Sequence, residues 1–116
     1  MSDELWLMLL LGIKHFVCDF PLQAHPYQYL NKGKFGHPGG LLHAGIHGVG
    51  TTLILGPFLG GLDALLHYWI DWLKVNTTKS FGLTPTNSEW FWILLGVDQL
   101  LHFLTYIGLI CLYMRM

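Results

Sequence analysis

Few folds suit this sequence, because four long apolar segments run through it, at about residues 4–20, 39–56, 59–75 and 89–113. A helix needs about 20 residues to cross a bilayer core, and roughly 17 to 25 are tolerated. Hydrophobic residues make up 53 % of the chain and charged residues only 11 %, whereas a typical soluble domain has about 25 % charged residues. So few charges would not cover a soluble surface, and the sequence therefore predicts an all-α integral membrane four-helix bundle.

The chain has 116 residues, which we expect to form a single membrane domain over residues 1–116. Polar connections are predicted at about 21–38 and 76–88, and the short stretch GPFLGG makes the two middle helices an antiparallel hairpin. Lysines lie in both long connections, which places these in the cytoplasm and both termini outside it. We expect a multi-pass protein of the bacterial inner (plasma) membrane. A net charge of −1 excludes a basic surface for nucleic acid.

Ionisable residues recur inside all four apolar segments at a spacing of four. This spacing puts the members of each set on one face of a helix. In an antiparallel bundle most of the sets reach a common depth, in the half that faces the long connections; Asp63 falls towards the opposite end. The four sets are His15 with Asp19, His43 with His47, Asp63 with His67 and Asp71, and Asp98 with His102.

These residues predict a metal site. An aspartate at the centre of a membrane helix costs about 2.5 to 3.5 kcal/mol, so several must be paired, hydrated or bound to a cation. Imidazole and carboxylate together suit a divalent transition metal such as Zn, Fe or Mn, and we expect one or two ions. Hydrogen-bonded staples between helices are the simpler alternative for any single pair. The expected metal ligands are His15, Asp19, His43, His67, Asp71, Asp98 and His102.

The function predicted from this site is that of a membrane-embedded metal-dependent enzyme. We expect a hydrolase that acts on a lipid or an amphipathic substrate. Asp19 and Asp98 are candidate general bases for bound water. Lys74, with Gln23 at the same rim, is a candidate to hold a phosphate or a carbonyl group.

Two other functions stay open at this stage. The same His and Asp residues could form a proton or metal-ion transport pathway, and Asp63 favours this slightly because a pathway needs groups along its length. The chain could also be a non-catalytic phage or bacterial membrane partner protein, with the polar pairs as staples. Membrane lipid is an expected partner, and a homodimer would help to cover the site.

Four short motifs, HFVCDFPLQ, HAGIHG, HYWIDWLK and DQLLH, resemble a family of small integral membrane proteins of bacteria and phages. That family is catalogued as a domain of unknown function, so the resemblance implies a fold but no activity. Its pattern is an early His-x-x-x-Asp followed by Leu-Gln, a central His, a His-x-x-x-Asp-x-x-Lys and a late Asp-Gln-x-x-His. The matching positions are His15, Asp19, Leu22, Gln23, His43, His67, Asp71, Lys74, Asp98, Gln99 and His102.

Overall fold

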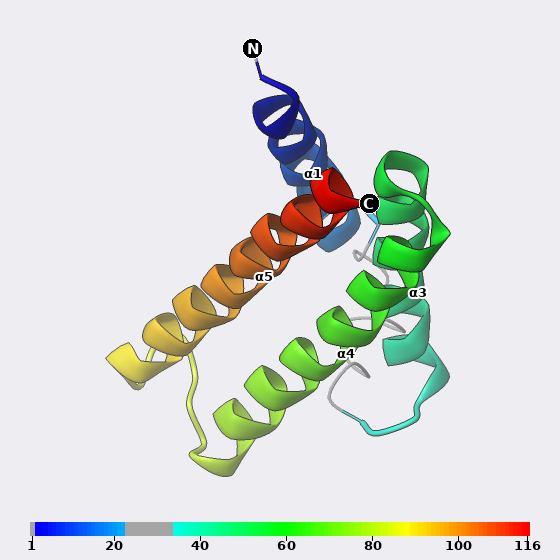
Figure 1. Ribbon diagram of the computed structural model, residues 1–116. Coiled ribbons are helices and arrows are strands. Elements are labelled where there is room, and N and C mark those ends of the chain that lie inside the picture. Colours follow the sequence, from blue (N-terminus) through cyan, green and yellow to red (C-terminus); the bar gives the residue numbers. More distant parts are fainter. Residues whose placement is uncertain (1, 23–33) are drawn as a thin grey trace.

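Four α-helices make up the part of the chain that the computed structural model describes, residues 2–22 and 34–116. The fold of this part is all-α, as the apolar segments predict (Figure 1). The helices are α1 (Asp3–Asp19), α3 (Pro38–Leu55), α4 (Pro57–Ser80) and α5 (Glu89–Arg115).

The helices begin at residues suited to that position. Ser2, His37 and Ser88 precede α1, α3 and α5, and the side chain of each accepts a hydrogen bond from a first-turn backbone N–H. Such caps satisfy one of the four amide groups that a helix start leaves without a partner. Between α3 and α4 the chain turns at a single residue, Gly56, whose φ of 99° favours glycine. Pro57 then starts α4, so the two helices form a tight hairpin.

Helix α4 extends beyond the C-terminal end of the predicted apolar segment 59–75. It continues to Ser80, and the following connection shortens to residues 81–88. Asn76 Nδ2 donates to the Trp72 carbonyl and Thr78 Oγ1 to the Lys74 carbonyl, each at 2.8 Å. These polar residues end the apolar pattern, but their side chains donate to carbonyl groups of the preceding turn. The helix therefore continues after the apolar residues end.

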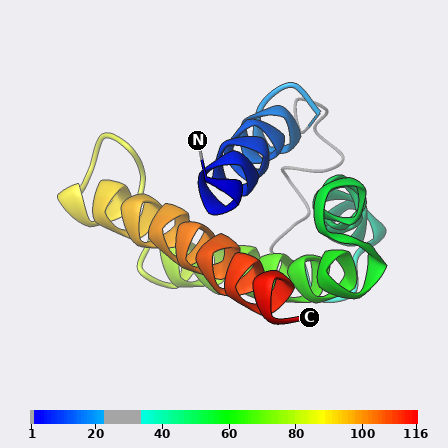
Figure 2. The same cartoon turned by 45° about the horizontal axis from the view of Figure 1, so that its top comes forward.

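The helices close a ring in which each one packs against two others: α1 lies against α3 and α5, and α4 also lies against α3 and α5. The ends of α4 and α5 that residues 81–88 join extend away from α1 and α3 in both views (Figure 1 and Figure 2). The closest approach is between α3 and α4. A Cβ atom at Gly60 would lie 1.8 Å from Thr52 Oγ1 and 2.6 Å from the Gly48 carbonyl oxygen. Glycine is therefore needed where these two backbones meet.

The interior of the bundle is unusual because half of its buried side chains are polar. Nine hydrophobic and nine polar or charged side chains are buried among the described residues. An apolar core includes Leu11, Leu55, Leu59, Leu109 and Ile110. The buried polar residues are Lys14, His43, His47, Thr51, Asp63, His67, Asp71, Asp98 and His102.

Of the helices in residues 2–22 and 34–116, only α5 qualifies by length and composition as a candidate membrane span. It has 27 residues. The sequence predicts that all four helices cross the membrane, and this criterion supports the prediction for α5 alone.

Candidate metal centre

All seven residues predicted as metal ligands meet in the interior, together with His47. Each helix contributes two of these eight residues, and their spacing of four places both on the inward face. The imidazoles of His43, His47, His67 and His102 are buried, whereas His15 and Asp19 are half-buried. The ring of helices therefore gathers residues that are up to 87 positions apart, from His15 to His102, into one cluster.

Asp19 of α1 lies at one side of the cluster, with four histidines around it. His47 Nε2 is 2.8 Å from Asp19 Oδ1, and His15 Nε2 is 2.9 Å from Asp19 Oδ2. His43 Nε2 and His67 Nε2 are farther from Oδ1, at 3.3 and 3.8 Å. Both carboxylate oxygens therefore face imidazole nitrogens.

Asp71 of α4 lies in the middle of the cluster. Its Oδ2 is 3.1 Å from His43 Nε2 and 3.2 Å from His67 Nε2. Its Oδ1 is 3.3 Å from His102 Nε2, and His102 Nε2 is in turn 3.5 Å from Asp98 Oδ1. The two oxygens of Asp71 thus face different histidines.

Several of these atoms face one another without forming hydrogen bonds. Among the described residues, neither His67 nitrogen has a hydrogen-bond partner, and neither does Asp71 Oδ2 or Asp98 Oδ1. Buried polar atoms in native proteins are nearly always bonded, so each exception calls for an explanation. A tetrahedral site with metal–ligand bonds of about 2.0–2.1 Å has ligand atoms about 3.3 Å apart. The 3.1–3.5 Å separations around Asp71 and His102 match that spacing, so these atoms could hold a metal ion.

Two overlapping groups in the cluster have donor atoms that all lie within 4.8 Å of one another. One consists of Asp19, His43, His47 and His67, and the other of His67, Asp71 and His102. The buried cluster could therefore hold a metal ion.

Lys14 is the main residue of this region that the sequence analysis missed. Its ammonium nitrogen lies 3.1 Å from Asp63 Oδ2, 3.0 Å from the Tyr106 hydroxyl and 3.0 Å from His47 Nδ1. Its alkyl stem passes Gly50, where a Cβ atom would lie 2.6 Å from Lys14 Cγ. A lysine in the middle of an apolar segment was itself a signal, because such a charge needs a buried partner.

Lys14 accounts for the position of Asp63, which lies away from the depth that the other ionisable residues share. Asp63 Oδ2 accepts hydrogen bonds from Lys14 Nζ and, at 2.5 Å, from Thr51 Oγ1. The side chains of Asp63 and Lys14 are 1 % and 5 % exposed. A buried ion pair accounts for the position of Asp63 without a transport pathway.

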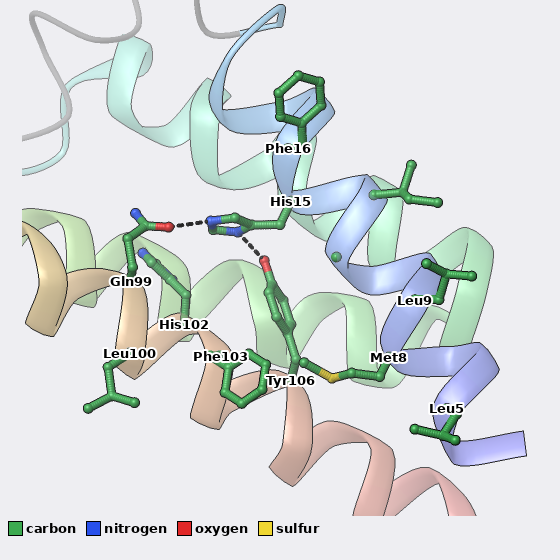
Figure 3. Close-up of a pocket in the computed structure, with 12 residues that line it drawn as sticks. Leu5, Met8, Leu9, His15, Phe16, Gln99, Leu100, His102, Phe103 and Tyr106 are labelled. Carbon is green, nitrogen blue, oxygen red and sulfur yellow. Dashed lines mark hydrogen bonds between the residues drawn. The ribbon is translucent and has the colours of Figure 1, made fainter. Parts of the chain in front are cut away.

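Gln99 and Tyr106 connect His15 to a groove between α1 and α5. Figure 3 shows the His15 ring pointing to both residues, with Nδ1 2.6 Å from the Tyr106 hydroxyl and Nε2 2.9 Å from Gln99 Oε1. The groove has a volume of about 830 Å³. Its walls are mostly apolar, with His15, Gln99, His102 and Tyr106 as the polar members. One side of the cluster therefore borders an apolar groove.

The two rim residues stand apart from this cluster. Lys74 is half-buried one helical turn beyond Asp71 and forms no ion pair within the described part of the chain. Gln23 lies outside the described residues. The role expected for both therefore stays a prediction.

Comparison with known proteins identifies the family but no characterised relative. No curated protein and no solved structure matches the chain. One family model matches residues 6–116, a span that contains every residue of the cluster. The chain therefore belongs to the family described as "Protein of unknown function (DUF3307)".

Proposed function

We propose that this protein is a membrane-embedded metal-dependent hydrolase that acts on an amphipathic substrate. The observation that carries the proposal is the arrangement around Asp71. Buried nitrogen and oxygen atoms from separate helices converge there at ligand-to-ligand distances, and some of them have no hydrogen-bond partner within residues 2–22 and 34–116. A merely structural His–Asp staple would use these atoms in hydrogen bonds.

The cluster offers two neighbouring positions for divalent ions such as Zn, Fe or Mn. Asp19, His43 and His67 would hold one ion, and Asp71 and His102 would hold the other, with Asp98 beside them. When bound, such ions polarise a carbonyl or phosphoryl oxygen and activate water. Asp98 or Asp19 would accept the proton.

The distribution of apolar side chains supports a bilayer environment for the whole bundle. Large hydrophobic residues face outward on every described helix, for example Leu53 at 83 % exposure and Phe58 at 68 %. The polar side chains face inward instead, which reverses the usual order of a soluble domain. We propose four membrane-crossing helices in the bacterial inner membrane, with both termini outside the cytoplasm.

The groove between α1 and α5 supports an amphipathic substrate. Its apolar walls would accept a hydrocarbon chain, and its polar residues include His15 and His102 of the cluster. A hydrolysable group attached to the chain would then lie next to the metal site. Pockets of this composition, apolar with a few convergent polar groups, are typical of small-molecule sites.

Elemental analysis tests the metal site directly. The protein is purified in mild detergent without a chelator, beside His67→Ala, Asp71→Asn and the surface control Asp3→Asn. We expect stoichiometric metal in the wild type and the control, and its loss in the other two variants. A folded wild-type protein without metal contradicts the proposal.

The substrate groove has its own test at Gly12, where an added Cβ would meet no atom of another described element within 4 Å. Gly12→Phe should fill the groove without disturbing the backbone. Losing about two buried methylenes costs about 1.6 kcal/mol, so KM for a dodecanoyl ester should rise roughly tenfold. KM for an acetyl ester of the same alcohol, whose acyl chain is too short to fill the groove, should stay unchanged.

The matched control is Gly45→Phe, at an equally open glycine in the apolar groove between α1 and α3. It should leave both KM values unchanged. Equal effects of the two variants on the dodecanoyl ester would show that the α1/α5 groove is not the chain site.

A further inference from the structure

The five histidines of the cluster differ in what their Nδ1 atoms contact. A neutral imidazole carries one N–H and one lone pair, so the partner of Nδ1 decides what Nε2 can do. His47 Nδ1 lies 3.0 Å from Lys14 Nζ, and His15 Nδ1 lies 2.6 Å from the Tyr106 hydroxyl. His67 Nδ1, in contrast, has no hydrogen-bond partner among the described residues.

Lys14 determines the state of His47. An ammonium group has three N–H donors and no acceptor. The three contacts of Lys14, with Asp63, Tyr106 and His47, use all three donors. His47 Nδ1 must therefore accept, and its proton must sit on Nε2, where it donates to Asp19 Oδ1 at 2.8 Å.

Tyr106 determines the state of His15 in the same way. Because Lys14 donates to the Tyr106 oxygen, the phenol proton is left to donate to His15 Nδ1. His15 Nε2 then carries a proton, and it lies 2.9 Å from both Asp19 Oδ2 and Gln99 Oε1. Both of these atoms are acceptors, so the proton belongs on Nε2, and the single N–H is shared between them.

The distances from the imidazole nitrogens to the carboxylates also fall into two groups. The 2.8–2.9 Å contacts of His15 and His47 with Asp19 have the length of charge-assisted hydrogen bonds. The contacts of His43, His67 and His102 with Asp71 are longer, at 3.1–3.3 Å, close to the separation of about 3.3 Å between ligands of one tetrahedral ion.

We propose that Lys14 and Tyr106 sort the histidines of this site: His43, His67 and His102 bind metal, whereas His15 and His47 are positioning residues that hold Asp19. This rests on the proposed metal site and narrows its ligand set. If His47 Nε2 bound an ion instead, its Nδ1 proton would point at the Lys14 ammonium group. The carboxylate–histidine pairs around Asp19 resemble the outer-shell contacts that orient ligands in metalloproteins.

The direct test is long-range ¹H–¹⁵N NMR of the metal-free protein in detergent micelles, with ¹⁵N-labelled histidine. We expect His15 and His47 in the Nε2–H form. Tyr106→Phe removes the phenol donor to His15, together with the oxygen that accepts from Lys14, and should change the His15 signature. Tyr113→Phe, at an exposed site, should not. An Nδ1–H form of His47 in the wild type, or a His15 signature that ignores Tyr106→Phe, overturns the inference.

Metal content gives a second, independent readout. Glutamine can donate an N–H to Asp19 but is a poor ligand for these metals, so His15→Gln and His47→Gln should keep stoichiometric metal and an unchanged cobalt absorption spectrum. His43→Gln and His67→Gln should lose the metal. Equal loss in His47→Gln and His67→Gln refutes the sorting while the metal site stands. If the wild type binds no metal, the proposed function fails, and the NMR result still decides the histidine states.

Discussion

Asp63 and Asp71 lie two turns apart on the same face of α4, both buried, but their surroundings differ. Asp63 Oδ2 accepts hydrogen bonds from Lys14 and Thr51, so its charge is balanced inside the protein. Asp71 faces three imidazoles, and its Oδ2 has no hydrogen-bond partner among the described residues. Each carboxylate thus has one oxygen without a hydrogen-bond partner among the described residues, Oδ1 in Asp63 and Oδ2 in Asp71. The difference is that the charge of Asp63 is paired with the Lys14 ammonium group, whereas Asp71 faces imidazoles, a donor set that suits a cation.

This difference has energetic consequences of opposite sign. Breaking a buried ion pair by removing one partner costs about 3–5 kcal/mol, because the other charge is left alone. Removing a buried polar group that already lacks a partner instead relieves a penalty of about 1–3 kcal/mol. Substitutions in the two regions should therefore separate a structural role from a ligand role.

Lys14→Met should have the largest effect on stability. It keeps the volume of the side chain but leaves the Asp63 carboxylate buried without its cation, so the free energy of unfolding should fall by about 3–5 kcal/mol. Unfolding by denaturant in detergent micelles measures this change. The double variant Lys14→Met with Asp63→Asn should recover most of the loss, and failure to recover would show that the two charges do not act as a pair.

Gly60→Ala should disturb both regions at once. The new Cβ atom would overlap Thr52 Oγ1 and the Gly48 carbonyl oxygen, which forces α3 and α4 apart and costs about 3 kcal/mol. Metal affinity should fall as well, because His43 and His67 lie on these two helices. Gly61→Ala is the control, since a Cβ atom there meets nothing within 4 Å in the part of the chain that the structure describes. Equal losses in both variants would rule out the contact as the cause.

The effect of His67→Leu on the free energy of unfolding should have opposite signs in the metal-free and the metal-bound protein. In the metal-free protein it removes two nitrogens without hydrogen-bond partners within the described residues, so the free energy of unfolding should rise by about 2 kcal/mol. In the presence of metal the same variant should be less stable than the wild type, because it gains nothing from the ion. Unfolding with and without chelator checks both signs, and destabilisation in both conditions would argue for a structural His67.

Thr51→Val should have the smallest effect. It removes one of the two hydrogen bonds to Asp63 Oδ2. Bonds to charged groups contribute about 1.5–3 kcal/mol, and the loss should lie at the low end because the Lys14 bond remains. Metal content should not change. Thr105→Val, which removes an exposed bond to the Leu101 carbonyl, should be nearly neutral in the same unfolding measurement.

Much of the site could be predicted from spacing alone. The i, i+4 pairs place His15 with Asp19, His67 with Asp71 and Asp98 with His102 on common helix faces, because 3.6 residues make a turn. The end of α4 could not be read in this way, since Asn76 and Thr78 continue the helix by bonding to backbone carbonyls after the apolar residues end.

What the sequence alone determined is the set of helices and the residues that each turns inward, since both follow from periodic patterns within one segment. Only the tertiary structure decided which groups meet across helices: Lys14 with Asp63 rather than with solvent, and His47 with Lys14 as well as with Asp19. These pairings depend on how closely the helices approach one another, as at Gly60, where α3 and α4 leave no room for a Cβ atom. No spacing along the chain encodes such distances, because packing between helices sets them.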